Sequence, residues 1–398
     1  MYHFYNNLCM KILYIASSGA PDGLYGGSVA LYNMIMSIKE SAEVFVVFPG
    51  NGELYRKLSN QGINCYIIPK YDLTVYPGIH GLRSLCEYIP RLLRMVYKRN
   101  RGYKNIDKLV KEIRPDIIHT NVGPEDYGHY VSLKNNIPHV WHIREYQDKD
   151  FKMHPYPSMK SFREKLQHPN NHLVSITKDI FRHFSMDMNK DIVIYDGVFP
   201  EKKVVENGIK EPYFLFTGSL KSAKGLDFLL VSYIEYIKQG GTYKLIVAGE
   251  GGPVAYKKKC LSMLRNAGIE ANVDFLGFRD DVYSLMSHAS AMVVPSRFEG
   301  FGFITAEAMY NNCLVIGRNT GGTKEQFDNG LLLHGKEIGL RFLTYEELTN
   351  HLLAIERNGV SYYSEMLNRA FYTVNKLYAN QVNLNNLLSF YKKILDNK

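Results

Sequence analysis

Short apolar runs rich in β-branched residues alternate along the chain with segments whose apolar residues recur at helical spacing. The apolar runs predict strands at residues 11–16, 44–48, 65–68, 117–119, 139–142, 213–218, 245–249, 273–278, 291–294 and 314–317. Strands that alternate with helices form parallel, doubly wound sheets with helices on both faces. The pattern therefore predicts an α/β fold in which ligands bind at the carboxyl ends of the strands.

The strand at residues 291–294 leads into the segment with the clearest chemistry. A loop with Glu299 and Gly302 follows it, and helical spacing from Phe303 places Glu307 about one turn inside a helix. The first amides of a helix have no intrahelical partner and attract anions. This segment could hold a phosphate on its amides and hydroxyl groups on its carboxylates. The alternative is an ordinary turn in which both glutamates are solvated.

Length and composition predict two domains. At 398 residues the chain exceeds one ordinary core and fits two domains of about 150 to 200 residues. A charged stretch at residues 200–212 marks the boundary, so we expect domains at 1–200 and 201–375 and a terminal helix at 376–398. No run approaches ~18 apolar residues and the start is polar, which predicts a cytosolic chain. The five cysteines are scattered, which favours reduced thiols.

The net charge of +9 is concentrated in one region. Residues 83–114 carry ten Lys or Arg against three acidic residues. From Leu82 onward apolar residues follow helical spacing, Pro90 kinks or divides the helix, and cations lie between them, among them Arg91, Arg94, Lys98 and Arg99. A basic amphipathic segment can lie on an anionic membrane. The alternative is a solvated face that packs on the first domain.

The segment from Glu299 to Glu307 resembles the E-x(7)-E motif of glycosyltransferase family 4, a group of retaining, nucleotide-sugar-dependent enzymes with the GT-B fold. Other segments resemble that family in register: Gly26-Gly27 after the polar turn at 17–28, His142, residues 174–178 and 192–198, the strand at 213–218, Lys224-Gly225, the strand at 273–278, and Gly321-Gly322. The resemblance covers nearly the whole chain. It implies two Rossmann-like domains that face each other across a cleft, with a final helix that returns to the first.

The resemblance also implies roles for individual residues. Glu307 binds the ribose hydroxyls, Glu299 the sugar hydroxyls, and Lys224 neutralises the diphosphate. His142 stands over the transferred sugar, so the predicted catalytic residues are Glu299, Lys224 and His142. The predicted donor-binding residues are Gly26, Gly27, Gly218, Ser219, Lys224, Gly277, Phe278, Glu299, Phe301, Gly302, Phe303, Glu307, Gly321 and Gly322.

Two positions depart from the family pattern. Ser219 stands where arginine is usual, so Lys221 or backbone amides must replace one phosphate cation, and Asp196 stands where asparagine is usual. Three of the predicted site features also have an alternative interpretation that involves no ligand. Gly26-Gly27 would then be an ordinary turn, His142 would be a histidine hydrogen-bonded at a strand end, and Lys224 would be a solvated lysine.

We expect a retaining transferase that moves a hexose-type sugar from a nucleotide-diphosphate sugar to a glycan or lipid-linked acceptor in cell-surface polysaccharide synthesis. No Asp-x-Asp cluster precedes a suitable strand, so we expect neither a metal nor a cofactor beyond the donor. The predicted location is cytoplasmic, peripheral on the inner face of the membrane. One alternative is a sugar-nucleotide epimerase of the same fold. A nucleic-acid-binding protein would explain the charge but not the two glutamates, so we expect no nucleic-acid partner.

Overall fold

The computed structural model describes residues 10–17, 26–69, 71, 73–78, 81–148, 153–198 and 208–397. The chain divides into two compact units, Met1–Gly197 with Asn380–Lys398, and Val198–Ala379. The divisions expected from the sequence were after residues 200 and 375. The first nine residues, residues 18–25 of the predicted turn and residues 199–207 of the predicted linker lie outside the described residues.

The first unit is built on a seven-stranded sheet with the order β3-β2-β1-β4-β5-β6-β7, in which every pairing is parallel. Its strands are β1 Lys11–Ile15, β2 Glu43–Phe48, β3 Asn64–Ile67, β4 Ile117–Thr120, β5 His139–Ile143, β6 Asn171–Ser175 and β7 Ile192–Val193. The central strands are buried because helices cover both faces, which explains their continuous apolar runs.

Eight helices are described in this unit: α1 Gly27–Ile38, α2 Glu53–Asn60, α3 Leu82–Cys86, α4 Tyr88–Ile113, α5 Tyr127–Asn135, α6 Met159–Leu166, α7 Lys178–His183 and α15 Asn380–Asp396. On one face, α1 and α15 pack against β1, with Leu31, Leu387 and Tyr391 in a shared core. On the other, Ile106 of α4 and Val131 of α5 are buried together. The end of the chain therefore completes the core of its first domain.

The second unit has a six-stranded parallel sheet with the order β10-β9-β8-β11-β12-β13. Its strands are β8 Glu211–Thr217, β9 Lys244–Ala248, β10 Val273–Gly277, β11 Ala289–Val294, β12 Val315–Arg318 and β13 Leu340–Phe342. Strand β13 was not predicted from the sequence, since three residues give too short a pattern. The other five match the predicted strands.

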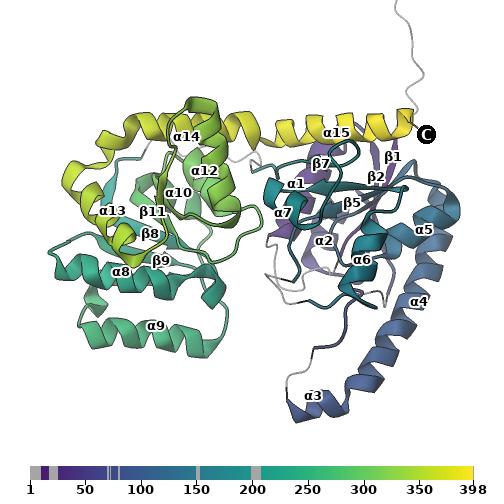
Figure 1. Cartoon of the computed structure of the whole chain (residues 1–398), viewed down its shortest axis with the longest axis horizontal. Coiled ribbons are helices and arrows are strands. Elements are labelled where there is room, and N and C mark those ends of the chain that lie inside the picture. The colour runs from purple at the N-terminus through teal and green to yellow at the C-terminus, as the bar shows by residue number, and fades with distance from the viewer. Residues whose placement is uncertain are drawn as a thin grey trace, which may run out of the picture. The chain divides into compact units, whose positions relative to one another are not determined.

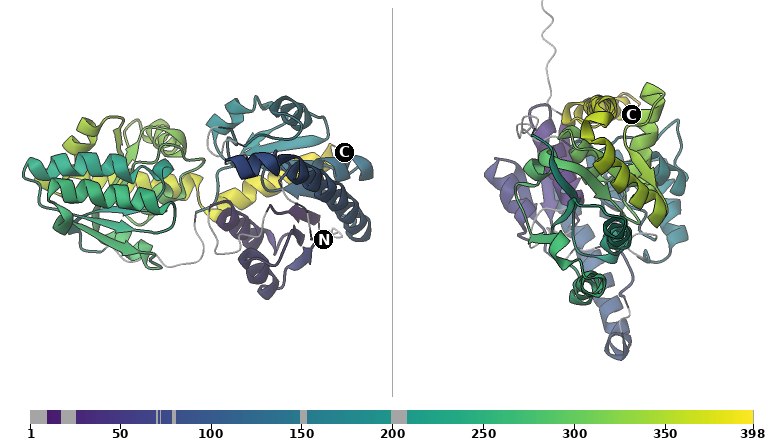
Figure 2. Two further views of the ribbon diagram at one scale, coloured as in Figure 1. Left: turned by 90° about the horizontal axis from the view of Figure 1, so that it is seen from below. Right: turned by 90° about the vertical axis from the view of Figure 1, so that its left-hand side faces the viewer.

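The helices of the second unit are α8 Leu226–Lys238, α9 Val254–Ala267, α10 Val282–His288, α11 Phe303–Tyr310, α12 Gly321–His334, α13 Tyr345–Asn358 and α14 Ser364–Leu377. Helices α8, α9 and α13 cover one face of the sheet, and α10, α11, α12 and α14 cover the other (Figures 1 and 2). Short 3-10 turns lie at Ser222–Lys224, Glu270–Asn272 and Val360–Tyr363. This doubly wound arrangement is the one predicted.

Helix α3 and the first half of α4 project from the body of the first unit (Figures 1 and 2). The sequence predicted that Pro90 kinks or divides this helix. The break falls at Glu87, and Pro90 lies in the first turn of α4, where a missing N–H leaves no helical bond unmade. Within the described residues no helix has the length and apolar character needed to cross a bilayer.

Candidate functional site

The site in the second unit forms where β8 and β11 end and α11 begins. Gly302 precedes α11 with φ +82°, a left-handed conformation that favours glycine, and no side chain caps the helix. Of the first-turn amides of α11, that of Thr305 donates to the Gly302 carbonyl at 3.0 Å, and no side chain caps those of Phe303 and Ile304. A free helix N-terminus at this edge is suited to an anion.

Two of the predicted catalytic residues meet here. The Lys224 Nζ lies 2.6 Å from the Glu299 Oε1, and Ser296 donates a hydrogen bond of 2.7 Å to the same oxygen. Both charged side chains are largely shielded from solvent. The carboxylate and the ammonium thus neutralise each other beside the α11 N-terminus, where an incoming diphosphate could attract the ammonium and sugar hydroxyls could donate to the carboxylate.

The loop between Glu299 and Phe303 is held from behind by α12. Gln326 donates to the carbonyl oxygens of Phe301, at 2.7 Å, and Gly302, at 3.0 Å. The Gly322 amide donates to the Glu299 carbonyl at 3.0 Å, and a Cβ at Gly322 would overlap the Phe301 carbonyl oxygen. The predicted Gly321-Gly322 turn is therefore glycine-rich because two backbones meet there.

Glu307 lies on α11 as predicted. Tyr283 of α10 donates to the Glu307 Oε1 at 3.1 Å, and burial raises the pKa of the Glu307 carboxyl, although the Tyr283 hydrogen bond opposes this. Gly218 and Ser219 follow β8, and Gly277, the last residue of β10, is followed by the exposed Phe278. The structure thus brings the predicted donor residues of this unit to one edge of one sheet.

A second polar cluster, which was not predicted, fixes the turn that carries Lys224. Asp227 receives two hydrogen bonds of 3.2 Å from Arg297, and others from Lys259 and Tyr256, both at 2.9 Å. Burial alone would raise the pKa of Asp227, but these partners lower it to about 2. Arg297 also donates to the Ser222 carbonyl. The only sign of this cluster in the sequence is an aspartate two residues after the Lys-Gly pair. Its role could not be predicted, because its partner Arg297 follows β11 and approaches it only when β11 lies beside β8.

In the first unit, Gly26 and Gly27 stand at the N-terminus of α1, as predicted. His142 stands near the end of β5 and its side chain is fully buried, so its predicted place over the transferred sugar stays a prediction. Its ring lies 5.4 Å from that of His119, and neither Nε2 has a partner among the described residues. Burial, helped by the nearby Arg144, holds the pKa of His142 well below its usual range, so the imidazole is neutral.

Arg144 links these strand ends. Its guanidinium forms a buried ion pair with Asp196 and donates to the Asn121 Oδ1 at 3.0 Å. The aspartate at position 196, where the family pattern has asparagine, is therefore matched by an arginine from the next-but-one strand. No role for Arg144 was predicted, since the partner lies 52 residues away.

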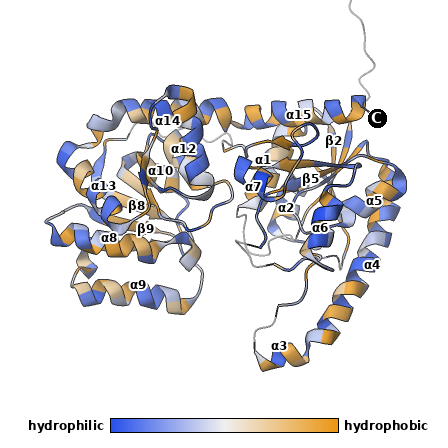
Figure 3. Cartoon of the chain, in the orientation of Figure 1, coloured by the Kyte–Doolittle hydropathy of each residue, from blue (hydrophilic) through white to orange (hydrophobic). Residues whose placement is uncertain are grey.

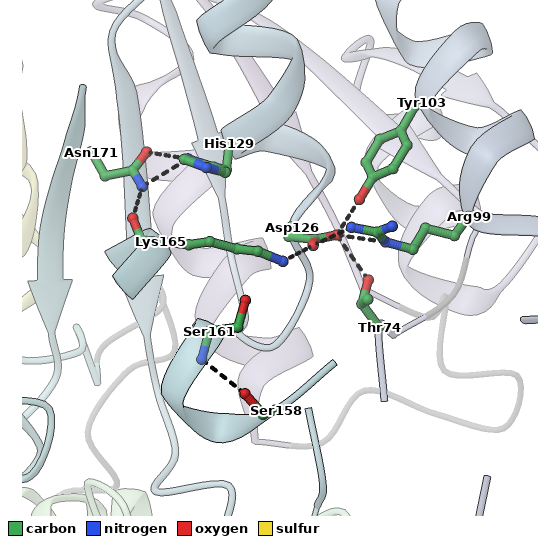
Figure 4. A network of polar contacts seen from close by, with 9 residues as sticks. All are labelled: Thr74, Arg99, Tyr103, Asp126, His129, Ser158, Ser161, Lys165 and Asn171. Atoms are coloured by element: carbon green, nitrogen blue, oxygen red, sulfur yellow. Dashed lines mark hydrogen bonds and ion pairs between the residues drawn. The ribbon is translucent and has the colours of Figure 1, made fainter. Parts of the chain in front are cut away.

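The four predicted membrane cations differ in exposure and in their partners. Arg99 turns inward: it pairs with Asp126 at 2.9 Å, and Tyr103, Thr74 and Lys165 also bind this carboxylate (Figure 4). It is a structural anchor and not a surface cation, which corrects that prediction. Arg91 donates to the Gly78 carbonyl at 2.9 Å and is half-buried, like Lys98, whereas Arg94 is exposed.

Among the described residues, no group of three or more His, Cys, Asp or Glu could hold a metal ion.

The family match lies in the second half of the chain. Residues 198–358 match the family model for glycosyl transferases group 1. An uncharacterized glycosyltransferase of Methanocaldococcus jannaschii is 33% identical over 41% of this chain and 47% of its own length. An N-acetylgalactosaminyltransferase of Campylobacter jejuni, named for a diphospho-undecaprenol-linked acceptor, is 25% identical over 39% of this chain and 43% of its own. The matched region spans less than half of each of these relatives.

Solved structures match over nearly the whole chain. Anabaena HepE in complex with UDP and glucose has a TM-score of 0.72 at 17% identity and covers 96% of this chain and 98% of its own. A glycosyltransferase from Rickettsia africae has the same TM-score and identity and covers 99% of this chain and 100% of its own. This likeness shows the α/β GT-B fold, and the segment with Lys224, Glu299 and Glu307 lies within the region that matches the group 1 glycosyl transferases.

Proposed function

We propose that the protein is a glycosyltransferase that moves a hexose-type sugar from a nucleotide-diphosphate sugar to a saccharide acceptor. The observation that carries this proposal is the Lys224–Glu299 pair beside the uncapped N-terminus of α11, with Glu307 one turn further along. The edge of the sheet there presents a cation and backbone amides, which suit the phosphates of such a donor. It also presents two carboxylates, which suit the hydroxyls of the sugar and of the ribose.

In this assignment Glu307 accepts from the ribose hydroxyls and Glu299 from the sugar hydroxyls. Amides of Phe301, Gly302 and Phe303 contact the sugar and phosphate, and Lys224 contacts the diphosphate. The base lies near Gly277 and Phe278. Ser219 leaves the usual arginine position without a cation, so the α11 amides must supply more of the stabilisation than they do where arginine is present.

For the chemical step we propose retention of the anomeric configuration and no metal requirement. Negative charge develops on the leaving diphosphate, and Lys224 with the α11 N-terminus can offset it. The departing phosphate oxygen then takes the acceptor proton, which requires no protein nucleophile. His142 is enclosed and neutral, so its contact with the sugar stays a prediction.

For the acceptor we propose a glycan or lipid-linked saccharide in cell-surface polysaccharide synthesis, handled on the cytoplasmic side of a membrane. Support comes from the Campylobacter relative's name and from a capsular polysaccharide biosynthesis glycosyltransferase of Staphylococcus aureus, 23% identical over 53% of this chain and 62% of its own. The epimerase alternative has no support among these relatives, whose names describe transferases.

A thermal-shift panel of nucleotide sugars tests the donor assignment. A donor at a hundred times its dissociation constant should stabilise the protein by ~2.7 kcal/mol. Glu307→Gln should reduce the shift, because an amide cannot accept on both atoms from a ribose diol, whereas Glu346→Gln, at an exposed position on α13, should keep it. If no nucleotide sugar shifts the transition, the proposal fails. Product analysis with and without a saccharide acceptor separates transfer from epimerisation, and the anomeric proton coupling of the product tests retention.

A further inference from the structure

The projecting part of the first unit carries an exposed apolar face. Five large side chains on α3 and α4, which we call the apolar stripe, are between 52% and 83% exposed: Leu82, Leu85, Ile89, Leu93 and Tyr97. They recur every three or four residues, a spacing that places successive members on one side of a helix, and apolar and polar segments alternate along α3 and α4 in Figure 3. The sequence predicted the amphipathic pattern but not that its apolar side faces solvent.

The same helix is anchored at its other end. Ile106, Leu109, Val110 and Ile113, in the second half of α4, are buried against the sheet. Between the two halves, the Arg99–Asp126 pair ties α4 to the start of α5, and Lys165 of α6 binds the same carboxylate at 2.5 Å (Figure 4). The stripe therefore projects on a helix that is fixed to the domain and not on a loose segment.

Cations border the stripe. Arg94, Arg101 and Lys104 are exposed, and Arg94 and Arg101 lie about a third of a turn around the helix from Ile89 and Leu93. The single carboxylate between residues 82 and 104, Glu87, pairs with Arg83 at 2.9 Å. Apolar side chains with positive charge beside them match the acyl boundary and headgroups of an anionic bilayer. A second copy of this face would bring like charges together, which disfavours self-association.

We propose that α3 and the first half of α4 dock the protein on an anionic lipid bilayer by inserting the apolar stripe at the level of the acyl boundary. Arg94, Arg101 and Lys104 then lie at the lipid phosphates. This proposal extends the proposed function to the membrane. Only the link between docking and a lipid-linked acceptor depends on the proposed function. The docking itself needs neither donor nor catalysis.

Vesicle flotation of the full-length protein tests the docking. We expect binding to vesicles of phosphatidylglycerol and phosphatidylcholine, and little binding to phosphatidylcholine alone. Combined Leu85→Gln, Ile89→Gln and Leu93→Gln should lower the partition coefficient at least about tenfold, because the inserted apolar area is lost. Combined Arg94→Gln, Arg101→Gln and Lys104→Gln should lower it as well and remove most of its salt dependence.

Matched controls separate the stripe from general hydrophobicity and charge. Met188→Gln, Val254→Gln and Leu332→Gln, three exposed apolar positions elsewhere, should bind like the wild type, as should Lys160→Gln, Lys257→Gln and Lys258→Gln. The proposal is overturned if the stripe variant and the wild type bind anionic vesicles equally. It is also overturned if the wild type does not bind anionic vesicles. A wild-type dimer in sedimentation velocity that the stripe substitutions dissociate, without vesicle binding, assigns the face to a second copy. None of these failures affects donor binding, so they are distinct from failure of the proposed function.

Discussion

The Lys224 ammonium and the Glu299 carboxylate, 75 residues apart in sequence, lie 2.6 Å apart at the carboxyl edge of the second sheet. The strand order explains the meeting: β8 and β11 are neighbours, so the turn after one faces the loop after the other. Neither side chain is fully exposed, which makes their mutual neutralisation effective.

Lys224→Ala should lower turnover by about 10²–10³-fold, because charge developing on the leaving group loses its cation in a shielded site. Ser219→Arg should be tolerated and could partly rescue that variant. The measurement is kcat with the donor found in the thermal-shift panel. Retained turnover in Lys224→Ala together with lost turnover in Lys221→Ala would show that the wrong lysine was chosen.

Donor affinity should fall in mild acid more than an ordinary glutamate would require. Burial raises the pKa of Glu307, so its carboxylate, which accepts from the ribose hydroxyls, is protonated at a higher pH than usual. The same shift affects the stability of the donor-free protein. Because the folded protein favours the protonated Glu307, this group contributes stability at low pH, and that contribution is lost as pH rises through its raised pKa. Isothermal titration with the donor at several pH values should show the loss of affinity in mild acid in the wild type. Glu307→Gln, which cannot titrate at this position, should lack it.

Asp227 should give the opposite pH dependence of stability. Its folded pKa of about 2 lies below the ordinary aspartate value of 3.8, so its contribution to stability is complete above pH 3.8 and is lost as pH falls towards 2. Asp227→Asn should flatten the dependence of urea unfolding midpoints on pH in this window. Asp280→Asn, at an exposed position, serves as the control and should leave the dependence as it is in the wild type.

Gly322→Ala should destabilise the second unit by about 1–3 kcal/mol, because its Cβ would overlap the Phe301 carbonyl oxygen. Gly50→Ala, where nothing lies within 4 Å of the added atom, should change stability little. Denaturant unfolding of both variants compares them. Equal stability would mean that the loop from Glu299 to Phe303 shifts freely, against the packing described above.

The sequence predicted the strands well because buried parallel strands are continuous apolar runs, and it missed β13, where three residues carry too little pattern. It placed Glu299, Glu307 and Lys224 at one edge because parallel strands end together. Their supporting partners Ser296, Tyr283 and Arg297 could not be foreseen, since hydrogen bonds between side chains depend on which strands are neighbours.

Side-chain direction was the weaker part of the prediction. Arg99 was grouped with surface cations because its sequence neighbours are basic, but it faces Asp126, whose position depends on how α5 packs on α4. His142 ends a strand, as expected, yet its side chain points into the domain. Periodicity gives the face of a helix or strand but does not say which face the rest of the fold covers.

The packing of α15 has a consequence for the order of folding during synthesis. Leu387, Phe390, Tyr391 and Ile394 fill a core otherwise made by residues that leave the ribosome far earlier, such as Ile12 and Leu31. Residues 198–379 contain their own complete core and can fold as soon as they emerge. The first domain to be synthesised is therefore the last to finish folding, and until α15 arrives it exposes an apolar surface that a chaperone can bind.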